Sequence, residues 1–436
     1  MKIYSYILTV LALCFAFYAC EEVAVTAPKE PSGPWNVAPL SEVGLSIENI
    51  NGGAIITYTI PNDPDIMYVM AEYERNGKIF TEKSSIHHNT LTIEGFHRVD
   101  HVKAKLYKVN KFEQRSEPLE IEFEPKESVI DIASNSIQLL PGFGGVTAIW
   151  ENPLQTELGA RLMTYDDSLY YRFDDREMVF STIEVDTVKF RGTEGYPSVE
   201  TLFGLVFEDK WGNVSDTIEF LTTPFFETMI PKPYVDFRSQ IPFDNITNLN
   251  TTTYPISKLW DGIVNTGFNG WLTQNGGSGL SITIDMKQTV KLSRILHHFY
   301  HVDQPYGQAN VVAWEIWGTD NIDFASIPSN TYWLDSLSLV TGHIHNQDPT
   351  QALPERTFKS DWEYLGYHQA PYYTAAADRN ALAERGNEME MPIDAKPVRY
   401  IRFFVRKMTS FVDPPLSNYF SCGELTFYGD NTVPQE

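Results

Sequence analysis

The stretch Leu259-Trp-Asp-Gly-Ile-Val-Asn-Thr-Gly-Phe-Asn-Gly-Trp271 is polar, rich in glycine and closed at both ends by tryptophan. Asp261-Gly262 is a turn signal, because glycine readily adopts positive φ and aspartate accepts hydrogen bonds from the backbone just ahead of it. The side chains of Asp261, Asn265 and Thr266, with loop carbonyls, supply the hard oxygen ligands that Ca²⁺ prefers. The alternative is a tight surface turn between two strands, and these residues by themselves favour the turn.

Segments with the pattern of β-strands follow this stretch. Residues 280–285 and 290–295 alternate apolar and polar side chains, as half-buried strands do. Residues 314–320 read Trp-Glu-Ile-Trp-Gly-Thr-Asp, which predicts an aromatic strand leading into a turn. Residues 398–405 and 424–429 complete the series, which predicts a β-domain in the last part of the chain.

In this order the segments resemble the discoidin, or coagulation factor 5/8 type C, domain. That family has an Asp-Gly loop ending in Thr and Trp, an Ile-Asp-Leu-like strand, an Arg-Tyr-Val-Arg-like strand and a final Glu-Leu-x-x-Tyr-Gly strand. The resemblance implies an antiparallel jelly roll over residues 233–436, and many bacterial members bind carbohydrate. It also implies that Glu424 reaches the calcium loop from the last strand, while Ile263 stands where relatives often have an aspartate.

The composition limits the classes of ligand. The 436 residues are enough for several domains, and the many aromatic residues, glycines and prolines suit strands separated by turns. The net charge of −24 argues against nucleic acid and against anionic lipid, since both are bound by clustered Lys and Arg. Cys14 and Cys20 fall in the leader and Cys422 stands alone, so no disulfide framework is predicted.

Residues 1–20 predict a signal peptide, because an apolar run from Ile7 to Ala19 is too short to span a bilayer as a mature helix. The leader ends Phe17-Tyr-Ala-Cys20, a loose match to the bacterial lipobox. Glu21-Glu22 follow, and acidic residues at this point resemble the surface-export signal of Bacteroidetes lipoproteins. The resemblance implies a lipid anchor on Cys20 at the outer membrane, facing the cell surface. The alternative is ordinary secretion with cleavage nearby.

Residues 41–127 and 128–225 predict two tandem β-sandwich modules, which follow an extended, proline-rich linker at 21–40. Asn51-Gly-Gly-Ala-Ile-Ile-Thr-Tyr58 matches Phe143-Gly-Gly-Val-Thr-Ala-Ile-Trp150, and the offset of about 90–100 residues is the length of one sandwich domain. Both modules resemble fibronectin type III or immunoglobulin-like folds. The predicted fold class is all-β, with two sandwiches followed by a discoidin-like jelly roll.

The whole order resembles Bacteroidetes surface lipoproteins encoded beside outer-membrane glycan-uptake machinery. The resemblance implies a glycan ligand, outer-membrane glycan-uptake proteins as partners, and membrane contact only through the lipid anchor. It carries over no binding residues.

A sugar site needs a flat aromatic face, which covers the C–H side of a pyranose, and a few fixed polar groups. The candidate ligand-binding residues are those in predicted loops of the last domain: Trp271, His301, Tyr306, Trp333 and Tyr372. For each ring taken singly, packing in the core is the alternative. Four tryptophans in or beside strands are predicted to be core residues: Trp260, Trp314, Trp317 and Trp362. A short helix is predicted over 375–384.

The sequence holds no catalytic signature such as Gly-x-Ser-x-Gly, His-Glu-x-x-His or a phosphate loop. The paired acids at 166–167 and 174–175 have the side chains of a glycosidase, but adjacent acids are usually solvated loop residues. We therefore predict a non-catalytic surface lipoprotein that binds an oligo- or polysaccharide through its C-terminal domain. Two alternatives stay open: a surface adhesin or scaffold that binds a protein partner, and a divergent glycoside hydrolase.

Overall fold

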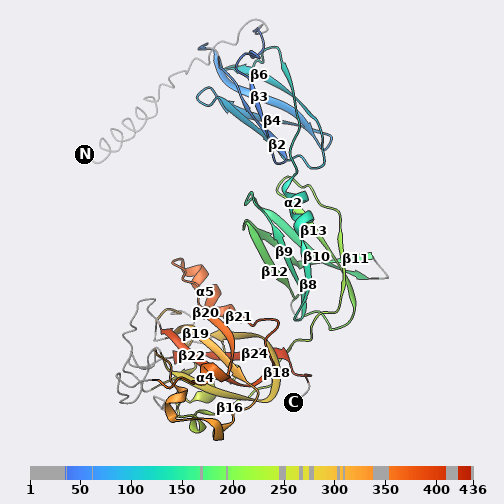
Figure 1. Ribbon diagram of the computed structural model, residues 1–436. Coiled ribbons are helices and arrows are strands. Elements are labelled where there is room, and N and C mark those ends of the chain that lie inside the picture. Colours follow the sequence, from blue (N-terminus) through green and yellow to red (C-terminus); the bar gives the residue numbers. More distant parts are fainter. Residues whose placement is uncertain are drawn as a thin grey trace, which may run out of the picture.

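Alternation of apolar and polar residues gives strands along most of the chain, and the predicted all-β fold class is confirmed. The computed structural model describes residues 35, 37–60, 62–166, 170–192, 195–244, 252–264, 269–273, 279–301, 305–307, 310–336, 353–408 and 421–433. A first module, a second module and a C-terminal domain follow one another in a row (Figure 1). Among the described residues, no helix is long and apolar enough to cross a membrane. Cys20 lies outside the described residues.

The first module packs two antiparallel sheets around one core. Its strands are β1 (Ser46–Ile50), β2 (Gly53–Thr57), β3 (Ile66–Arg75), β4 (Lys78–Ser85), β5 (Thr90–Glu94), β6 (Val102–Asn110) and β7 (Leu119–Phe123). The strand orders are β1-β2-β5 and β4-β3-β6-β7. Asn76 and Gly77 both have positive φ, which suits the tight turn that joins β3 to β4.

The second module repeats this topology. Its elements are α2 (Val129–Ser136), β8 (Gln138–Gly142), β9 (Gly145–Glu151), β10 (Leu158–Asp166), β11 (Tyr170–Ser181), β12 (Val185–Phe190), β13 (Thr201–Asp209) and β14 (Ile218–Thr222). The strand orders β12-β9-β8 and β11-β10-β13-β14 correspond to those of the first module. Helix α2 is not predicted from the sequence. It begins after Ser128, whose side chain accepts a hydrogen bond from Asp131 N, and it buries Val129, Ile130 and Ala133.

The C-terminal domain is built around one long strand. Its strands are β15 (Thr228–Met229), β16 (Val235–Asp236), β17 (Trp271–Leu272), β18 (Ser281–His298), β19 (Val311–Thr319), β20 (Glu363–Gln369), β21 (Asn387–Glu390), β22 (Val398–Met408), β23 (Ser421–Cys422) and β24 (Glu424–Asp430). The main sheet has the order β15-β24-β18-β22-β19-β20. Residues 280–285 and 290–295, predicted as two strands, lie in or beside β18, which pairs with β22 over its first half and with β24 over its second.

The described residues of this domain also form the short helices α4 (Phe358–Asp361) and α5 (Ala376–Arg385), and α5 lies within one residue of the helix predicted at 375–384. The same described residues form the short 3-10 helices η1 (Arg238–Gln240), η2 (Ile256–Leu259), η3 (Phe324–Ser326) and η4 (Asn330–Trp333). Its main core lies between the sheet faces and contains the predicted core tryptophans Trp260 and Trp314.

A second hydrophobic layer covers the outer face of β22. The described parts of the insertion between β19 and β20 fold back over this face, where Tyr332, Trp333, Phe358 and Trp362 pack with Phe404 of β22. In a sandwich with bare outer faces, a side chain in the position of Phe404 would meet water. The described parts of the insertion therefore cover this face of the sheet, and most of their aromatic residues are buried.

Ion pairs join the second module to the C-terminal domain. Arg191, just after β12, contacts Glu388 at 2.9 Å and also Glu390, both on β21. Lys189 of β12 contacts Glu390 at 2.7 Å. Arg294 of β18 contacts Glu388 at 3.1 Å, so Glu388 is shared by arginines from both units. Several partly buried pairs that share partners hold this joint more firmly than a single exposed pair would.

The buried His297 gives the C-terminal domain a predicted sensitivity to acid. Its ring lies 4.6 Å from the Trp314 ring, between centroids, and burial lowers the pKa of His297 to about 3. Below its ordinary pKa of about 6.5, His297 takes up a proton in the unfolded chain but not in the folded one. Stability is therefore lost as pH falls from about 6.5 towards 3, and the loss at pH 5 is about 2 kcal/mol from this group.

Urea unfolding at pH 7 and pH 5 measures this effect, followed by tryptophan fluorescence because most of the nine tryptophans lie in the C-terminal domain. His297→Gln removes the titrating group, so the variant is expected to lose less stability between the two pH values than the wild type. Equal losses in the two proteins would contradict the assignment.

Candidate functional site

The structure places three of the five predicted ligand-binding residues in the interior. Trp271 on β17 is fully buried, and the Arg238 guanidinium lies 4.9 Å from its ring centroid. Trp333 is 2% exposed and packs edge-on against Trp362. His301 is also buried. A buried ring has no open face on which a sugar can stack, so Trp271 and Trp333 are core residues, contrary to the sequence prediction. Trp333 is covered because the insertion folds back over β22.

Tyr306 and Tyr372, the other two predicted residues, lie together although 65 residues separate them in the sequence. Their ring centroids are 4.9 Å apart. The Tyr306 hydroxyl donates a hydrogen bond to Pro371 O at 2.7 Å and accepts one from Tyr373 N at 2.9 Å, so this ring is fixed. Tyr372 is 63% exposed. The exposed ring of Tyr372 is therefore supported by the fixed ring of Tyr306, in the loops beside α5.

Of the four predicted calcium ligands, the structure describes Asp261 and Glu424. Asn265 and Thr266 lie outside the described residues. Asp261 and Glu424 do lie close together, because Gly262 N donates a hydrogen bond to Glu424 Oε1 at 3.1 Å. Within the described ranges, no group of three or more His, Cys, Asp or Glu side chains is arranged to hold a metal ion. Calcium binding stays a prediction that these contacts do not test.

A second aromatic surface lies on the outer face of β19 and β20. In the register of this strand pair, Trp317 lies opposite Tyr364, and Glu315 lies opposite Tyr367. Glu315 and Trp317 are two residues apart and therefore share a face. Tyr364 is 48% exposed and Tyr367 is 47% exposed. We call Trp317, Tyr364 and Tyr367 the aromatic platform.

A β-bulge brings the two tyrosines of the platform onto one face. In a regular strand, residues three apart point to opposite faces. Here Ile316 pairs with Gly366 and Trp317 pairs with Tyr364, so Leu365 is an extra residue. Gly366 has φ +131°, a conformation that other residues rarely adopt. A glycine inside a strand pattern is the sequence signal that indicates such a bulge.

A cluster of paired charges borders the platform. The Glu315 carboxylate accepts hydrogen bonds from Lys359 Nζ and from Trp317 Nε1, both at 3.1 Å. Arg406 Nη1 lies 3.5 Å from Glu315, and Lys359 Nζ lies 2.6 Å from Asp335. We call Glu315, Asp335, Lys359 and Arg406 the charge cluster. Each acid is paired with a base, so the cluster offers polar groups in fixed positions without a large net charge.

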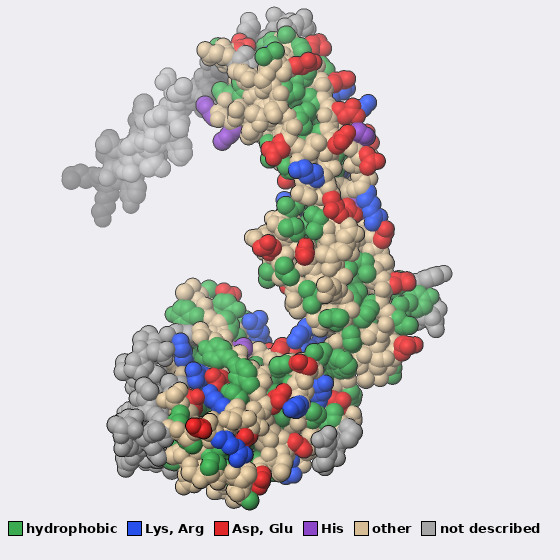
Figure 2. Space-filling view, viewed as in Figure 1, with side chains coloured by type: hydrophobic (Ala, Val, Ile, Leu, Met, Phe, Trp, Pro, Cys, Tyr) green, Lys and Arg blue, Asp and Glu red, His purple; other side chains and the backbone are tan. Residues whose placement is uncertain are grey.

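The pKa of Tyr364 reflects the short distance between the aromatic platform and the charge cluster. Burial raises the pKa of Tyr364, and the negative charge of Glu315 raises it further. The Tyr364 ring centroid lies 4.8 Å from that of Trp317, and Lys359 Nζ lies 5.1 Å from the Trp317 ring. Figure 2 shows hydrophobic side chains next to charged ones on the visible face of the C-terminal domain. Such a face provides ring stacking and hydrogen bonds side by side, which is what a polyhydroxylated ligand requires.

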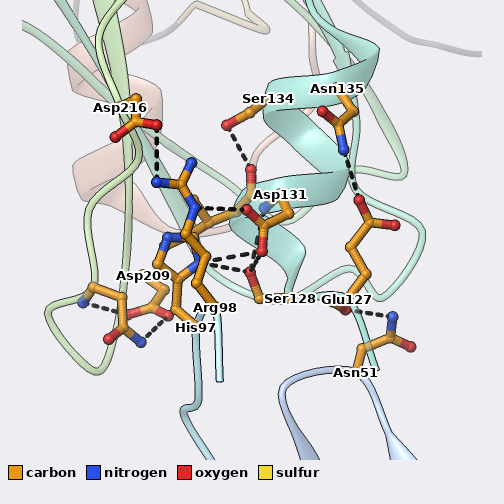
Figure 3. A network of polar contacts seen from close by, with 12 residues as sticks. Asn51, His97, Arg98, Glu127, Ser128, Asp131, Ser134, Asn135, Asp209 and Asp216 are labelled. Atoms are coloured by element: carbon orange, nitrogen blue, oxygen red, sulfur yellow. Dashed lines mark hydrogen bonds and ion pairs between the residues drawn. The ribbon is translucent and has the colours of Figure 1, made fainter. Parts of the chain in front are cut away.

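A serine, a histidine and an aspartate also meet, at the joint between the first and second modules (Figure 3). Ser128 Oγ lies 2.9 Å from His97 Nδ1, and Asp131 Oδ2 lies 3.2 Å from the same nitrogen. In a hydrolase triad the serine and the acid contact different nitrogens of the histidine. Ser128 also caps α2, so this group has the geometry of a helix cap at a domain joint.

Three parts of the chain match sequence families that have no assigned function. Residues 41–125 match Domain of unknown function (DUF4959), residues 126–233 match Domain of unknown function (DUF5126), and residues 260–429 match the domain of unknown function DUF5000. No curated protein matches the chain.

Solved structures show likenesses at low identity. A SusE-like protein is 18% identical, with 69% of this chain and 98% of that chain covered and a TM-score of 0.36. CBM32-1 from a family 31 glycoside hydrolase of Clostridium perfringens is 14% identical, with 44% and 99% covered and a TM-score of 0.24. A two-domain fibronectin type III segment of chicken tenascin is 11% identical, with 41% and 97% covered and a TM-score of 0.21. None of these structures is close enough to assign a function.

Proposed function

We propose that the protein is a non-catalytic carbohydrate-binding protein and that its C-terminal domain binds the glycan on the aromatic platform. The observation that carries this proposal is the arrangement of Tyr364 and Tyr367, two half-exposed rings on one face of β20, beside carboxylates and cations held in fixed positions. The rings cover the apolar side of a pyranose, and the charge cluster hydrogen-bonds its hydroxyl groups. Five of these seven residues lie on strands β19, β20 and β22, which position them rigidly.

The platform favours a neutral ligand that lies across an open surface. The cations of the charge cluster are already paired with Glu315 and Asp335, and the net charge of the whole chain is −24, so an acidic polymer would be repelled. A shallow site of this kind binds weakly, with a Kd of roughly 1 μM–1 mM. Weak sites suffice on a surface where many copies act together on one polymer.

The sequence also supports a place on the cell surface. The proposal includes a lipid on Cys20, a position in the outer membrane and a role beside glycan-uptake proteins, all of which rest on the resemblances of the leader and of the domain order. The two modules between the anchor and the C-terminal domain would then hold the binding face away from the membrane.

The test begins with a glycan array probed with the soluble chain that starts at Glu21. For the glycan that is captured, Tyr364→Ala and Tyr367→Ala are each expected to weaken binding about 10- to 30-fold, because a central aromatic contact contributes about 1.5–2 kcal/mol. Isothermal titration calorimetry measures the change in Kd, and thermal unfolding checks that the domain stays folded.

Tyr165→Ala is the matched control, because Tyr165 is an exposed tyrosine on β10 of the second module, and it is expected to leave the Kd unchanged. Capture that survives both platform substitutions would place the site elsewhere. A protein partner retained without any glycan would favour the adhesin or scaffold, and turnover of the glycan would favour the hydrolase.

A further inference from the structure

Lys232 places a positive charge beside the carboxylate that the calcium prediction relies on. Lys232 lies in the segment between β15 and β16, and its ammonium group contacts Glu424 Oε1 and donates a hydrogen bond to Thr426 Oγ1 at 2.8 Å. Both partners lie on β24, two residues apart and on one face. The Lys232 side chain is 16% exposed and that of Glu424 is 1% exposed, so this ion pair is mostly shielded from water.

The Asp261-Gly262 turn docks on the same carboxylate through its backbone. Gly262 N donates to Glu424 Oε1 at 3.1 Å, and Asp261 Oδ1 accepts a hydrogen bond from Ile263 N at 2.9 Å. Asn269 closes the loop by donating to Ile263 O at 3.0 Å. Glu424 therefore organises the loop with an amide and an ammonium group as its partners.

Among the described residues, the donor groups around Glu424 do not make up a calcium site. Ca²⁺ takes about six to eight oxygen ligands. Glu424 Oε1 is already shared by Lys232 and Gly262. Oε2 of Glu424 is buried and has no hydrogen-bond partner among the described residues, so it is the one oxygen of this carboxylate that could still bind a metal ion. The side chain of Ile263 is apolar and supplies no ligand oxygen. The positive charge of the Lys232 ammonium group would also repel a divalent cation bound next to Glu424.

We propose that the Lys232 ammonium supplies, as a built-in cation, the positive charge that the family resemblance assigns to Ca²⁺ at this loop. The described parts of the loop, residues 259–264 and 269–271, are then held in place without a metal ion. The stability of the C-terminal domain does not depend on the calcium concentration outside the cell, and chelators leave it unchanged.

The test compares thermal unfolding of the soluble chain from Glu21 in millimolar CaCl₂ and in EDTA. The wild-type Tm of the C-terminal transition is expected to be the same in both, and calorimetric titration with CaCl₂ is expected to give no binding. Lys232→Met leaves the buried Glu424 charge without its partner, so its Tm is expected to fall by several degrees in EDTA. Calcium is expected to restore part of this loss, because Asp261 and Glu424 can then share the ion.

Two further variants keep the result interpretable if Lys232→Met fails to fold. Lys232→Arg retains a cation and is expected to keep a calcium-insensitive Tm. Lys232→Met combined with Glu424→Gln removes both charges and is expected to regain stability without any response to calcium. A wild-type Tm that rises with CaCl₂, or a Lys232→Met Tm equal to that of the wild type, would overturn the proposal.

Discussion

Replacing Arg402 with methionine will lower the free energy of unfolding of the C-terminal domain by about 3–5 kcal/mol. Arg402 on β22 and Asp244 are both fully buried, and Arg402 Nη2 lies 3.0 Å from Asp244 Oδ1. The guanidinium also donates to Thr283 Oγ1 and to Trp333 O, each at 3.0 Å. The substitution leaves the Asp244 carboxylate buried without its counter-ion, and the cost of that uncompensated charge is the main effect.

Urea unfolding followed by tryptophan fluorescence measures the loss, and the double variant with Asp244→Asn tests its cause. The asparagine carries no charge. Its amide oxygen can accept a hydrogen bond from one of the two hydroxyl groups that bond to Asp244 in the wild type, those of Ser281 and Thr283, and its amide nitrogen can donate to the other. The double variant is therefore expected to be more stable than Arg402→Met alone, since removing both partners of a buried pair costs less than removing one. Strictly additive losses, or a loss below about 1 kcal/mol in the single variant, would contradict this account.

Replacing Trp333 with alanine is the second large effect that the structure predicts. Trp333 lies in the layer between the insertion and β22, with the Arg402 guanidinium 5.2 Å from its ring centroid. Truncating a buried tryptophan costs about 3–5 kcal/mol, because it removes apolar contacts and leaves a cavity. In a domain of this size, each kcal/mol shifts Tm by about 2–4 °C, so the Tm falls by roughly 6–20 °C.

Tyr372→Ala is the matched comparison, because both aromatic residues are predicted from the sequence as ligand contacts. Tyr372 is mostly exposed, and its removal is expected to change the stability by no more than about 0.5 kcal/mol. Thermal unfolding of the two variants decides between the assignments. A folded Trp333→Ala protein with the wild-type Tm would show that this ring is not part of the core.

The strands can be predicted from the sequence because they follow from local alternation of apolar and polar residues. The repeat of the two modules can be predicted because short segments of one match short segments of the other. It also brings Asp261 and Glu424 together through a family resemblance, and the hydrogen bond from Gly262 N to Glu424 joins them in the structure. Local sequence patterns do not show how a long connecting segment packs against the sheet. Trp333 lies in the insertion before β20 and Tyr372 lies in the segment after β20, yet one is covered and the other is exposed.

The aromatic platform escapes sequence reasoning for a different reason. Trp317 lies in a regular strand pattern, which predicts a core position, and Tyr364 and Tyr367 have a spacing that predicts opposite faces. The extra residue Leu365 changes this parity. Gly366 signals a bulge in the sequence, but the residues that a bulge places on one face depend on the partner strand, so they are known only from the pairing of β19 with β20.

The ion pairs between the second module and the C-terminal domain also limit how the chain can be recombined by engineering. Glu388 and Glu390 lie on β21, but two of the cations that neutralise them, Lys189 and Arg191, belong to the second module. Grafting the C-terminal domain onto an unrelated carrier would leave these glutamates beside one another, with Arg294 as the remaining cation on Glu388. The portable unit of this protein is therefore the second module together with the C-terminal domain, and a smaller transplant requires both glutamates to be neutralised.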